Sequence, residues 1–271
     1  MLILASETDA AARNIRDRLL TLRDHDIVGE FEGHSIIEFE PGKVRLATIP
    51  FPALEFDNPH RKVFPDLPDP DVMVYLSRHQ SVSGTKTLTV HPIGNFSEAV
   101  FGGHERTVAP SSPHLMTHAL RLLSSHPIEG YEITFEATHH GPFNEVPTFF
   151  IEIGSTETEW KDPIAVEALA QTMDQLIHDY LDDVIPTTPT NAVCIGLGGG
   201  HYAPRHTKHA LQEDLDFGHI VPSYARKGLD TQLAEEIIRK TPGVTRVCAH
   251  RKKHRKEGRV FQELGLEYIE Y

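Results

Sequence analysis

Short apolar runs alternate with amphipathic helical patterns along most of this chain, and this alternation limits the folds that it can adopt. It is typical of α/β folds, in which helices cover a sheet. Two runs that flank Pro41-Gly42 predict a hairpin, so we expect an α/β fold whose mixed sheet has flanking helices. The expected strands are residues 2–5, 36–39, 44–49, 72–76, 88–90, 132–137, 148–153, 192–197 and 244–249, and the expected helices are residues 9–22, 113–123, 163–180 and 231–239.

The length of 271 residues suits one large domain or two closely joined lobes. We treat residues 1–271 as one unit, with residues 1–95 as an N-terminal α/β lobe and residues 96–271 as a catalytic α/β lobe if it divides. Cys194 and Cys248 lie in apolar runs, as small core residues of a reducing compartment do. No apolar run approaches the roughly 18 residues that span a bilayer, and the start lacks a basic signal-peptide region. We therefore expect a cytoplasmic protein with no membrane partner.

The net charge of −13 argues against casual nucleic-acid binding, but the charge is uneven. A basic run occupies residues 251–259 and offers a polyanion a place to dock. The alternative is a solvated, positively charged helix start, which the composition favours equally. The basic residues of this run are Arg251, Lys252, Lys253, Arg255, Lys256 and Arg259.

Several of the 18 histidines lie in loops that follow apolar strands, where open α/β folds place their sites. One such loop is ATHHGP at residues 137–142. Adjacent side chains on an extended backbone point to opposite sides, so His139 and His140 face one metal only if the loop turns, which Gly141-Pro142 permits. We expect one of the two to be the active group and the other to position it. The alternative is a pair of exposed loop histidines.

A second loop begins with Gly198, Gly199 and Gly200 and leads into His201. Three glycines let the backbone approach a ligand and present N–H groups, as anion-binding nests do. Such donors can hold a phosphate, a terminal ribose or the oxyanion of ester cleavage. The alternative is a tight strand-to-helix turn with no ligand. His206, five residues beyond His201, is a further candidate metal ligand.

Glu152 falls near the end of an expected strand, where a carboxylate can bind metal, act as a base or orient a histidine. Ser155 or Thr156 followed by Glu159 also resembles a helix capping box. Trp160, the only tryptophan, is expected in the core or a pocket wall. His79 lies in a loop that either caps the same pocket or covers the surface. Five further histidines are expected to have no role in the site, namely His114, His118, His126, His178 and His219.

The chain lacks HExxH, paired-cysteine zinc motifs, GxSxG, a P-loop and GxGxxG. Serine α/β-hydrolases, nucleoside triphosphatases and simple dinucleotide enzymes are therefore not the leading interpretations. Histidine-rich loops with Glu152 instead favour hydrolysis by an activated water.

Three stretches together resemble the archaeal and plant type of D-aminoacyl-tRNA deacylase: ATHHGP at 137–142, EIGSTETEW at 152–160 and GGGHYAPRHT at 198–207. The start of the chain, SRH at 77–79 and FGHI at 217–220 resemble that family too. The resemblance implies hydrolysis of the ester between a D-amino acid and the terminal ribose of tRNA. It also implies zinc dependence, a monomer, and a fold similar to peptidyl-tRNA hydrolase and purine nucleoside phosphorylase.

Within that family reading we assign roles by residue type. His139, His201 and His206 are the candidate zinc ligands, and His140, Glu152 and His201 the candidate catalytic residues. The glycine turn, with His79, would receive the terminal nucleotide or the ester carbonyl. Phosphates of the tRNA stem would contact Arg251, Lys252, Lys253 and Arg255.

Two other functions remain open at this point. A metal-dependent hydrolase of a small amide or ester needs the histidine site but not the basic run. A non-catalytic tRNA- or nucleotide-binding protein needs the basic run and the glycine turn but not the histidines.

Overall fold

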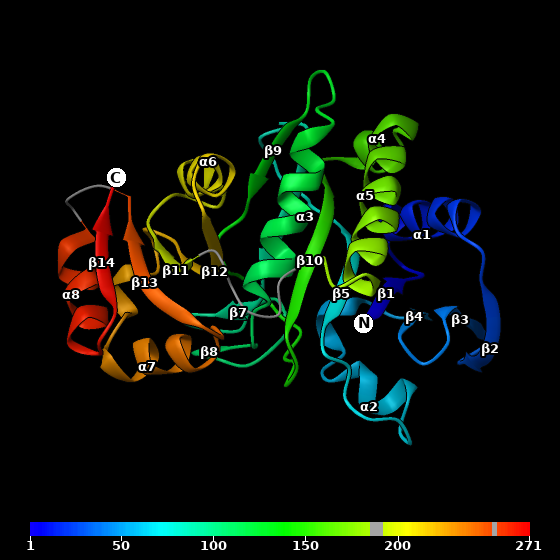
Figure 1. Ribbon diagram of the computed structural model, residues 1–271, viewed down its shortest axis with the longest axis horizontal. Coiled ribbons are helices and arrows are strands. Elements are labelled where there is room, and N and C mark those ends of the chain that lie inside the picture. Colours follow the sequence, from blue (N-terminus) through cyan, green and yellow to red (C-terminus); the bar gives the residue numbers. More distant parts are fainter. Residues whose placement is uncertain (185–191, 251–253) are drawn as a thin grey trace.

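The computed structural model describes residues 1–184, 192–250 and 254–271 and shows a mixed α/β fold, as predicted (Figure 1). The largest element is an eight-stranded sheet in the order β2-β3-β4-β1-β5-β10-β6-β9. A four-stranded sheet, β12-β11-β13-β14, and a small β7-β8 pair complete the fold. The strands are β1 (Leu2–Ser6), β2 (Asp26–Phe31), β3 (His34–Glu40), β4 (Val44–Ile49), β5 (Met73–Arg78), β6 (Thr87–Pro92), β7 (Gly94–Asn95), β8 (Thr107–Val108), β9 (Glu132–Phe135), β10 (Thr148–Gly154), β11 (Ala192–Leu197), β12 (Leu215–Val221), β13 (Val244–Ala249) and β14 (Glu267–Glu270).

The helices that were expected begin close to their sequence signals. The Asp9 carboxylate accepts a hydrogen bond from the Ala12 amide, and Asp162 caps the longest helix in the same way. Ser112 differs, because its side chain makes no capping hydrogen bond although the helix begins at Pro113 as predicted. The helices are α1 (Ala10–Leu22), α2 (Pro59–Val63), α3 (Pro113–Ser125), α4 (Glu157–Trp160), α5 (Pro163–Leu181), α6 (Pro204–Gln212), α7 (Thr231–Arg239) and α8 (Arg255–Glu263), with short 3-10 turns at Ala53–Glu55 and Arg226–Gly228.

Helices α1, α3 and α5 pack together on one face of the large sheet, where the main hydrophobic core lies. The opposite face carries a smaller core that includes Tyr75 and Phe150, whose rings stack with centroids 4.5 Å apart. Side chains two residues apart on a strand share a face. Ser77, His91 and Glu152 therefore lie on this second face, because the strand register places Ser77 and Thr89 beside Glu152 and His91 beside Phe150. Polar groups thus continue the smaller core toward one end of the sheet.

The predicted hairpin is confirmed by the antiparallel pairing of β3 with β4. An edge strand, β2, was missed because nearly all of its residues are exposed and no apolar alternation marks it. The small sheet is parallel throughout and holds Cys194 in β11 and Cys248 in β13, both buried free thiols. The strands of the large sheet come from residues 2–154 and those of the small sheet from residues 192–270. Among the described residues, no helix is long and apolar enough to cross a membrane.

Candidate active site

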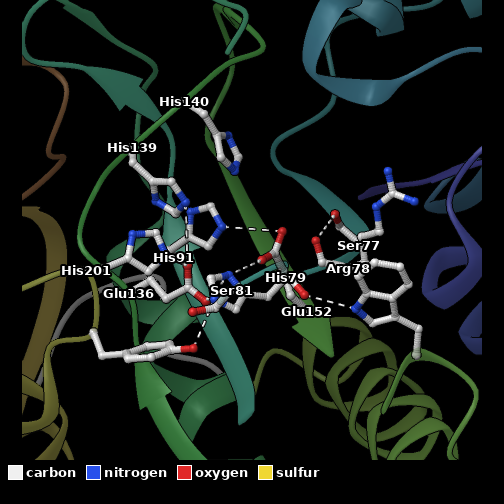
Figure 2. Close-up of polar contacts among 12 residues, drawn as sticks. Ser77, Arg78, His79, Ser81, His91, Glu136, His139, His140, Glu152 and His201 are labelled. Atoms are coloured by element: carbon white, nitrogen blue, oxygen red, sulfur yellow. Dashed lines mark hydrogen bonds and ion pairs between the residues drawn. The ribbon is translucent and has the colours of Figure 1, made fainter. Parts of the chain in front are cut away.

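The two sheets meet along residues 136–139, which extend β9 beyond its last strand residue. On one side the Glu136 amide donates to the Val90 carbonyl, and on the other the Ala137 amide donates to the His201 carbonyl at 2.8 Å. The Thr138 amide in turn donates to the Ile220 carbonyl of β12. This segment therefore brings the two histidine loops of the sequence to one place, beside the polar end of the smaller core (Figure 2).

Three histidines at this junction share one arrangement, in which the Nδ1 atom of the ring lies next to a backbone carbonyl. The Nδ1 atoms of His91, His139 and His140 lie 3.1, 2.8 and 2.6 Å from the backbone carbonyls of Pro92, Ala137 and Gly141, respectively. A carbonyl oxygen only accepts, so each ring carries its proton on Nδ1 and keeps the lone pair of Nε2 free. Ring nitrogens of these three residues lie within 4.8 Å of one another.

Both histidines of the ATHHGP loop face this point because the backbone turns at His140. His140 has a φ of +44°, a left-handed conformation that breaks the alternation of an extended chain. The two imidazole centroids are consequently only 4.2 Å apart. Gly141 then packs so closely under Gly103 that an added Cβ would lie 2.2 Å from the Gly103 amide nitrogen. The expectation that the loop must turn for both histidines to face one point is met, and ring nitrogens of both lie at that point.

Glu136 lies at the centre of a second group. Its carboxylate is fully buried and lies 2.9 Å from Nε2 of His201 and 3.1 Å from Nδ1 of His79. Ring nitrogens of these two histidines and an oxygen of Glu136 lie within 4.8 Å of one another. The other nitrogen of His79, Nε2, lies 3.0 Å from the Tyr202 hydroxyl, and the Trp160 indole donates to the His79 carbonyl. His79 is thus fixed on three sides, whereas the His201 side chain is 39% exposed.

Glu152 lies on the far side of these histidines. Its two oxygens are 3.7 Å from Nδ1 of His79 and 3.6 Å from Nε2 of His91. Burial raises the pKa of Glu152 well above its usual range, and the negative charge of Glu136 raises it further. Burial acts on Glu136 in the same direction, but the contacts with His201 and His79 outweigh it and bring the pKa of that carboxyl well below its usual range. The site therefore pairs a carboxyl group that favours the ionised form with one that favours the protonated form.

The histidines of the cluster also fall into two groups, those with a lowered pKa and those with a raised pKa. Burial lowers the pKa of His91 to about 4 and of His140 to about 3, and it holds the pKa of His139 well below the usual range. Burial would also lower the pKa values of His79 and His201, but Glu136 more than compensates and raises both. Three neutral imidazoles thus lie beside two that favour the charged form.

Several buried atoms of the cluster lack a hydrogen-bond partner among the described residues. They are Nε2 of His91, Nε2 of His201 and both carboxylate oxygens of Glu136. Glu136 and His201 lie at ion-pair distance, but their angles do not suit a hydrogen bond. Buried donors and acceptors are normally satisfied, so convergent unsatisfied nitrogens and oxygens are what a cation site presents.

Comparisons with known proteins identify the family to which this chain belongs. A family model described as D-aminoacyl-tRNA deacylase matches residues 67–268. A D-aminoacyl-tRNA deacylase of Thermococcus kodakarensis is 33% identical over 277 residues, which cover 98% of this chain and 98% of that protein. A protein of the same name from Pyrococcus horikoshii is 34% identical with the same coverage. The chain belongs to the D-aminoacyl-tRNA deacylase family.

The resemblance found in the sequence is thereby confirmed, and with it the assignment to the hydrolases. A crystal structure of a conserved protein of unknown function, AF0625, superposes with a TM-score of 0.86 at 30% identity. It covers 99% of this chain and 94% of that one, so the arrangement of both sheets has an experimental counterpart.

Of the residues assigned to this deacylase site from sequence, five lie together in the cluster: His79, His139, His140, Glu152 and His201. His206 does not join them. It is buried behind β11 with Nδ1 2.5 Å from the Tyr271 hydroxyl, and burial lowers its pKa to about 3. Helix α6 carries its side chain inward toward the core of the small sheet, where it packs on Phe217.

The glycine turn lies next to the cluster, with Gly198 and Gly199 at φ values of +106° and +93°. The turn is joined directly to the site, because His201 follows Gly200 in the chain. Arg255 is exposed at the start of α8 and pairs with Glu270 at 3.0 Å. Residues 251–253, which include the other predicted phosphate contacts Arg251, Lys252 and Lys253, lie outside the described residues.

Sequence reasoning missed two members of the cluster, His91 and Glu136. Glu136 was read as part of an apolar strand, although an acid in such a run is a sign of a buried site, and His91 was read as a strand end. Other interpretations are confirmed by the structure. Thr156 and Glu159 form a capping box, Trp160 is buried, and His219 is a buried histidine bonded to the Ala109 carbonyl.

Proposed function

We propose that this chain hydrolyses the ester of D-aminoacyl-tRNA, releasing the free D-amino acid and tRNA. Family membership supports the reaction, and one observation supports the assignment of the histidine cluster as its active site. Ring nitrogens of His91, His139 and His140 lie within 4.8 Å of one another, and each ring has its Nδ1 on a backbone carbonyl, which leaves Nε2 unprotonated. An aminoacyl ester is already reactive, so positioning water and stabilising developing charge supply most of what the reaction needs.

We further propose that this cluster holds zinc. The donor set fits the ion, because zinc binds neutral imidazole and its ligands usually give their second ring N–H to a carbonyl or carboxylate. Among the described residues, the ring N–H groups of His91, His139 and His140 meet this pattern, and His206 lies elsewhere. When bound, zinc would supply Lewis-acid chemistry that makes water a stronger acid.

The charged histidines have a different proposed role. His201 is the most exposed member of the cluster, and its contact with Glu136 favours the imidazolium form. It would give its Nδ1 proton to the ribose oxygen as the ester C–O bond breaks, while Glu136 stabilises the charge on the ring. Glu152 would act as a positioning residue that keeps the rings of His79 and His91 in place. His140 would hold the ion together with His91 and His139.

The tRNA would approach the exposed side of His201, and the basic residues near Arg255 would contact its phosphates without reading sequence. We propose that the protein acts as a monomer. The substrate places the reaction in the cytoplasm.

Release of amino acid from D-tyrosyl-tRNA and L-tyrosyl-tRNA by the purified protein, with and without a chelator, tests the proposal. Loss of the D-ester that stops on chelation and returns with zinc is the expected result. Loss of the D-ester despite chelation would retain the function and reject the metal. Stability of both esters at low and high salt would overturn the deacylase proposal in favour of a small amide or ester as substrate.

A further inference from the structure

Two exposed aromatic side chains lie in loops that are bonded to the histidine loops, and neither has a role in the chemistry described above. Phe101 is 68% exposed and Tyr224 is 63% exposed, whereas aromatic side chains of this size are usually buried. Both lie in loops rather than on a helix face that could pack elsewhere, Phe101 between β7 and β8 and Tyr224 after β12.

Phe101 is bonded directly to the loop of His139 and His140. Its carbonyl accepts a hydrogen bond of 2.9 Å from the Gly141 amide, and an added Cβ on Gly141 would lie 2.4 Å from the Gly102 carbonyl carbon. The neighbouring Val100 is also 69% exposed, so the apolar surface continues past the ring. Phe101 is thus held beside the imidazoles on one side of the cluster.

The residue before Tyr224 is bonded to the loop that leads into His201. The amide of the preceding Ser223 donates to the Gly199 carbonyl at 3.1 Å, within the glycine turn. Desolvation by the surrounding loops raises the pKa of the Tyr224 phenol even though most of its surface is exposed, and the charge of Glu136 adds to the effect. Through Ser223, Tyr224 is held next to the glycine turn that precedes His201.

The loops of the two aromatic residues also contact each other. Arg106, at the end of the Phe101 loop, donates to the Gly228 carbonyl at 3.0 Å and pairs with Asp230 at 2.7 Å, both shortly after Tyr224. These contacts tie the loop that carries Phe101 to the segment that follows Tyr224. Two exposed aromatic side chains thus lie in loops that are bonded to the two histidine loops of the site.

We infer that Phe101 and Tyr224 stack on bases of the unpaired 3′ end of the tRNA, and this rests on the proposed function. The ester is on the terminal ribose, so when it reaches His201 the base on that ribose must lie beside the cluster. Single-stranded RNA ends are bound largely by stacking on Phe and Tyr rings. Stacking tolerates any base, which suits an enzyme that must act on many tRNAs with the same end.

The test measures single-turnover hydrolysis of D-tyrosyl-tRNA by Phe101→Ala and Tyr224→Ala. Each is expected to raise the half-saturating enzyme concentration about 5- to 150-fold, with the rate at saturation within about threefold of wild type. Phe101→Trp and Tyr224→Phe keep a ring and should restore binding. Ile27→Ala, which removes a 69% exposed side chain from the remote edge strand β2, is the matched control.

A second readout does not depend on turnover. Uncharged tRNA with 2-aminopurine in place of the terminal adenine should lose fluorescence when wild-type protein binds, because stacking quenches this base. The two alanine variants should lose less of it. Binding of this tRNA without quenching, or equal affinity for wild type and both alanine variants, overturns the inference. Failure of wild-type protein to hydrolyse D-tyrosyl-tRNA while quenching persists would instead count against the proposed function alone.

Discussion

The opposite charge states of Glu136 and Glu152 give the sharpest test of the site. Replacing each by glutamine keeps its size and removes only the capacity to ionise. Glu136 is the ionised member, in contact with His201 at 2.9 Å and His79 at 3.1 Å. The raised pKa of Glu152 favours its protonated form, which an amide resembles. The two variants should therefore behave very differently although the residues are neighbours.

We expect Glu136→Gln to lower the single-turnover rate on D-tyrosyl-tRNA by about 10²–10⁴-fold, the usual contribution of a proton-transfer group. This corresponds to about 3–5 kcal/mol of barrier. The reason is that His201 loses the charge that keeps it protonated. For Glu152→Gln we expect a rate within about threefold of wild type, because no charge changes.

The pH profile carries the same reasoning with a definite sign. Glu136 raises the pKa of His201, so the active imidazolium persists above the ordinary histidine pKa and activity falls as pH rises through the raised value. In Glu136→Gln this falling limb should move to lower pH. Single-turnover rates of wild type and both variants, measured from pH 5 to 9 with circular dichroism to check folding, test this expected shift. Equal losses in the two variants, or a greater loss in Glu152→Gln, would refute the assignment of charge.

Three further predictions follow from the same geometry. Without metal, Glu152→Gln should unfold at a higher denaturant concentration than wild type, and the difference should grow as the pH rises above 4.5. The reason is that a carboxyl group whose pKa is raised in the folded state lowers the stability of the wild type as pH rises from the unfolded pKa toward the folded one, by at most about 1.4 kcal/mol per pH unit. If the stabilities of wild type and variant, both measured in a chelator, change in parallel with pH, the prediction is contradicted. His91→Ala should lower the zinc bound per chain and His206→Ala should not, as elemental analysis after dialysis would show; zinc loss in His206→Ala alone would return that residue to the ligand set. Gly141→Ala should lower both activity and stability, the latter by about 1–3 kcal/mol, because its Cβ meets backbone rather than a movable side chain; an unchanged denaturation midpoint would show that the loop yields freely.

Much of the fold could be predicted because apolar periodicity reports burial directly. The runs at 44–49 and 192–197 coincide with β4 and β11, and Asp162-Pro163 marks the start of α5. Strand β2 could not be found in this way, since its pairing with β3 is made by backbone atoms while its side chains face solvent.

Only part of the candidate site, mainly the residues that lie in loops, could be predicted from the sequence. Loop histidines stand out because Gly and Pro surround them, as at His139, His140 and His201. His91 and Glu136 have apolar or strand-like neighbours, and their role depends on which strands become adjacent. Local sequence carries little information on that adjacency, because pairing between distant strands is decided by the whole sheet. His206 shows the converse, since its loop-like context resembled that of His201 while the helix turns it into the core of the small sheet.

Burial of Glu136 explains why its neighbours have the properties that chemistry needs. A fully buried carboxylate is costly unless positive charge or a cation lies next to it. His79 and His201 supply part of that compensation, and the oxygens still lack hydrogen-bond partners among the described residues. The remaining deficit is what makes a cation favourable beside the neutral imidazoles of His91, His139 and His140. One buried acid at the junction of two sheets thus connects the charged and the neutral halves of the site.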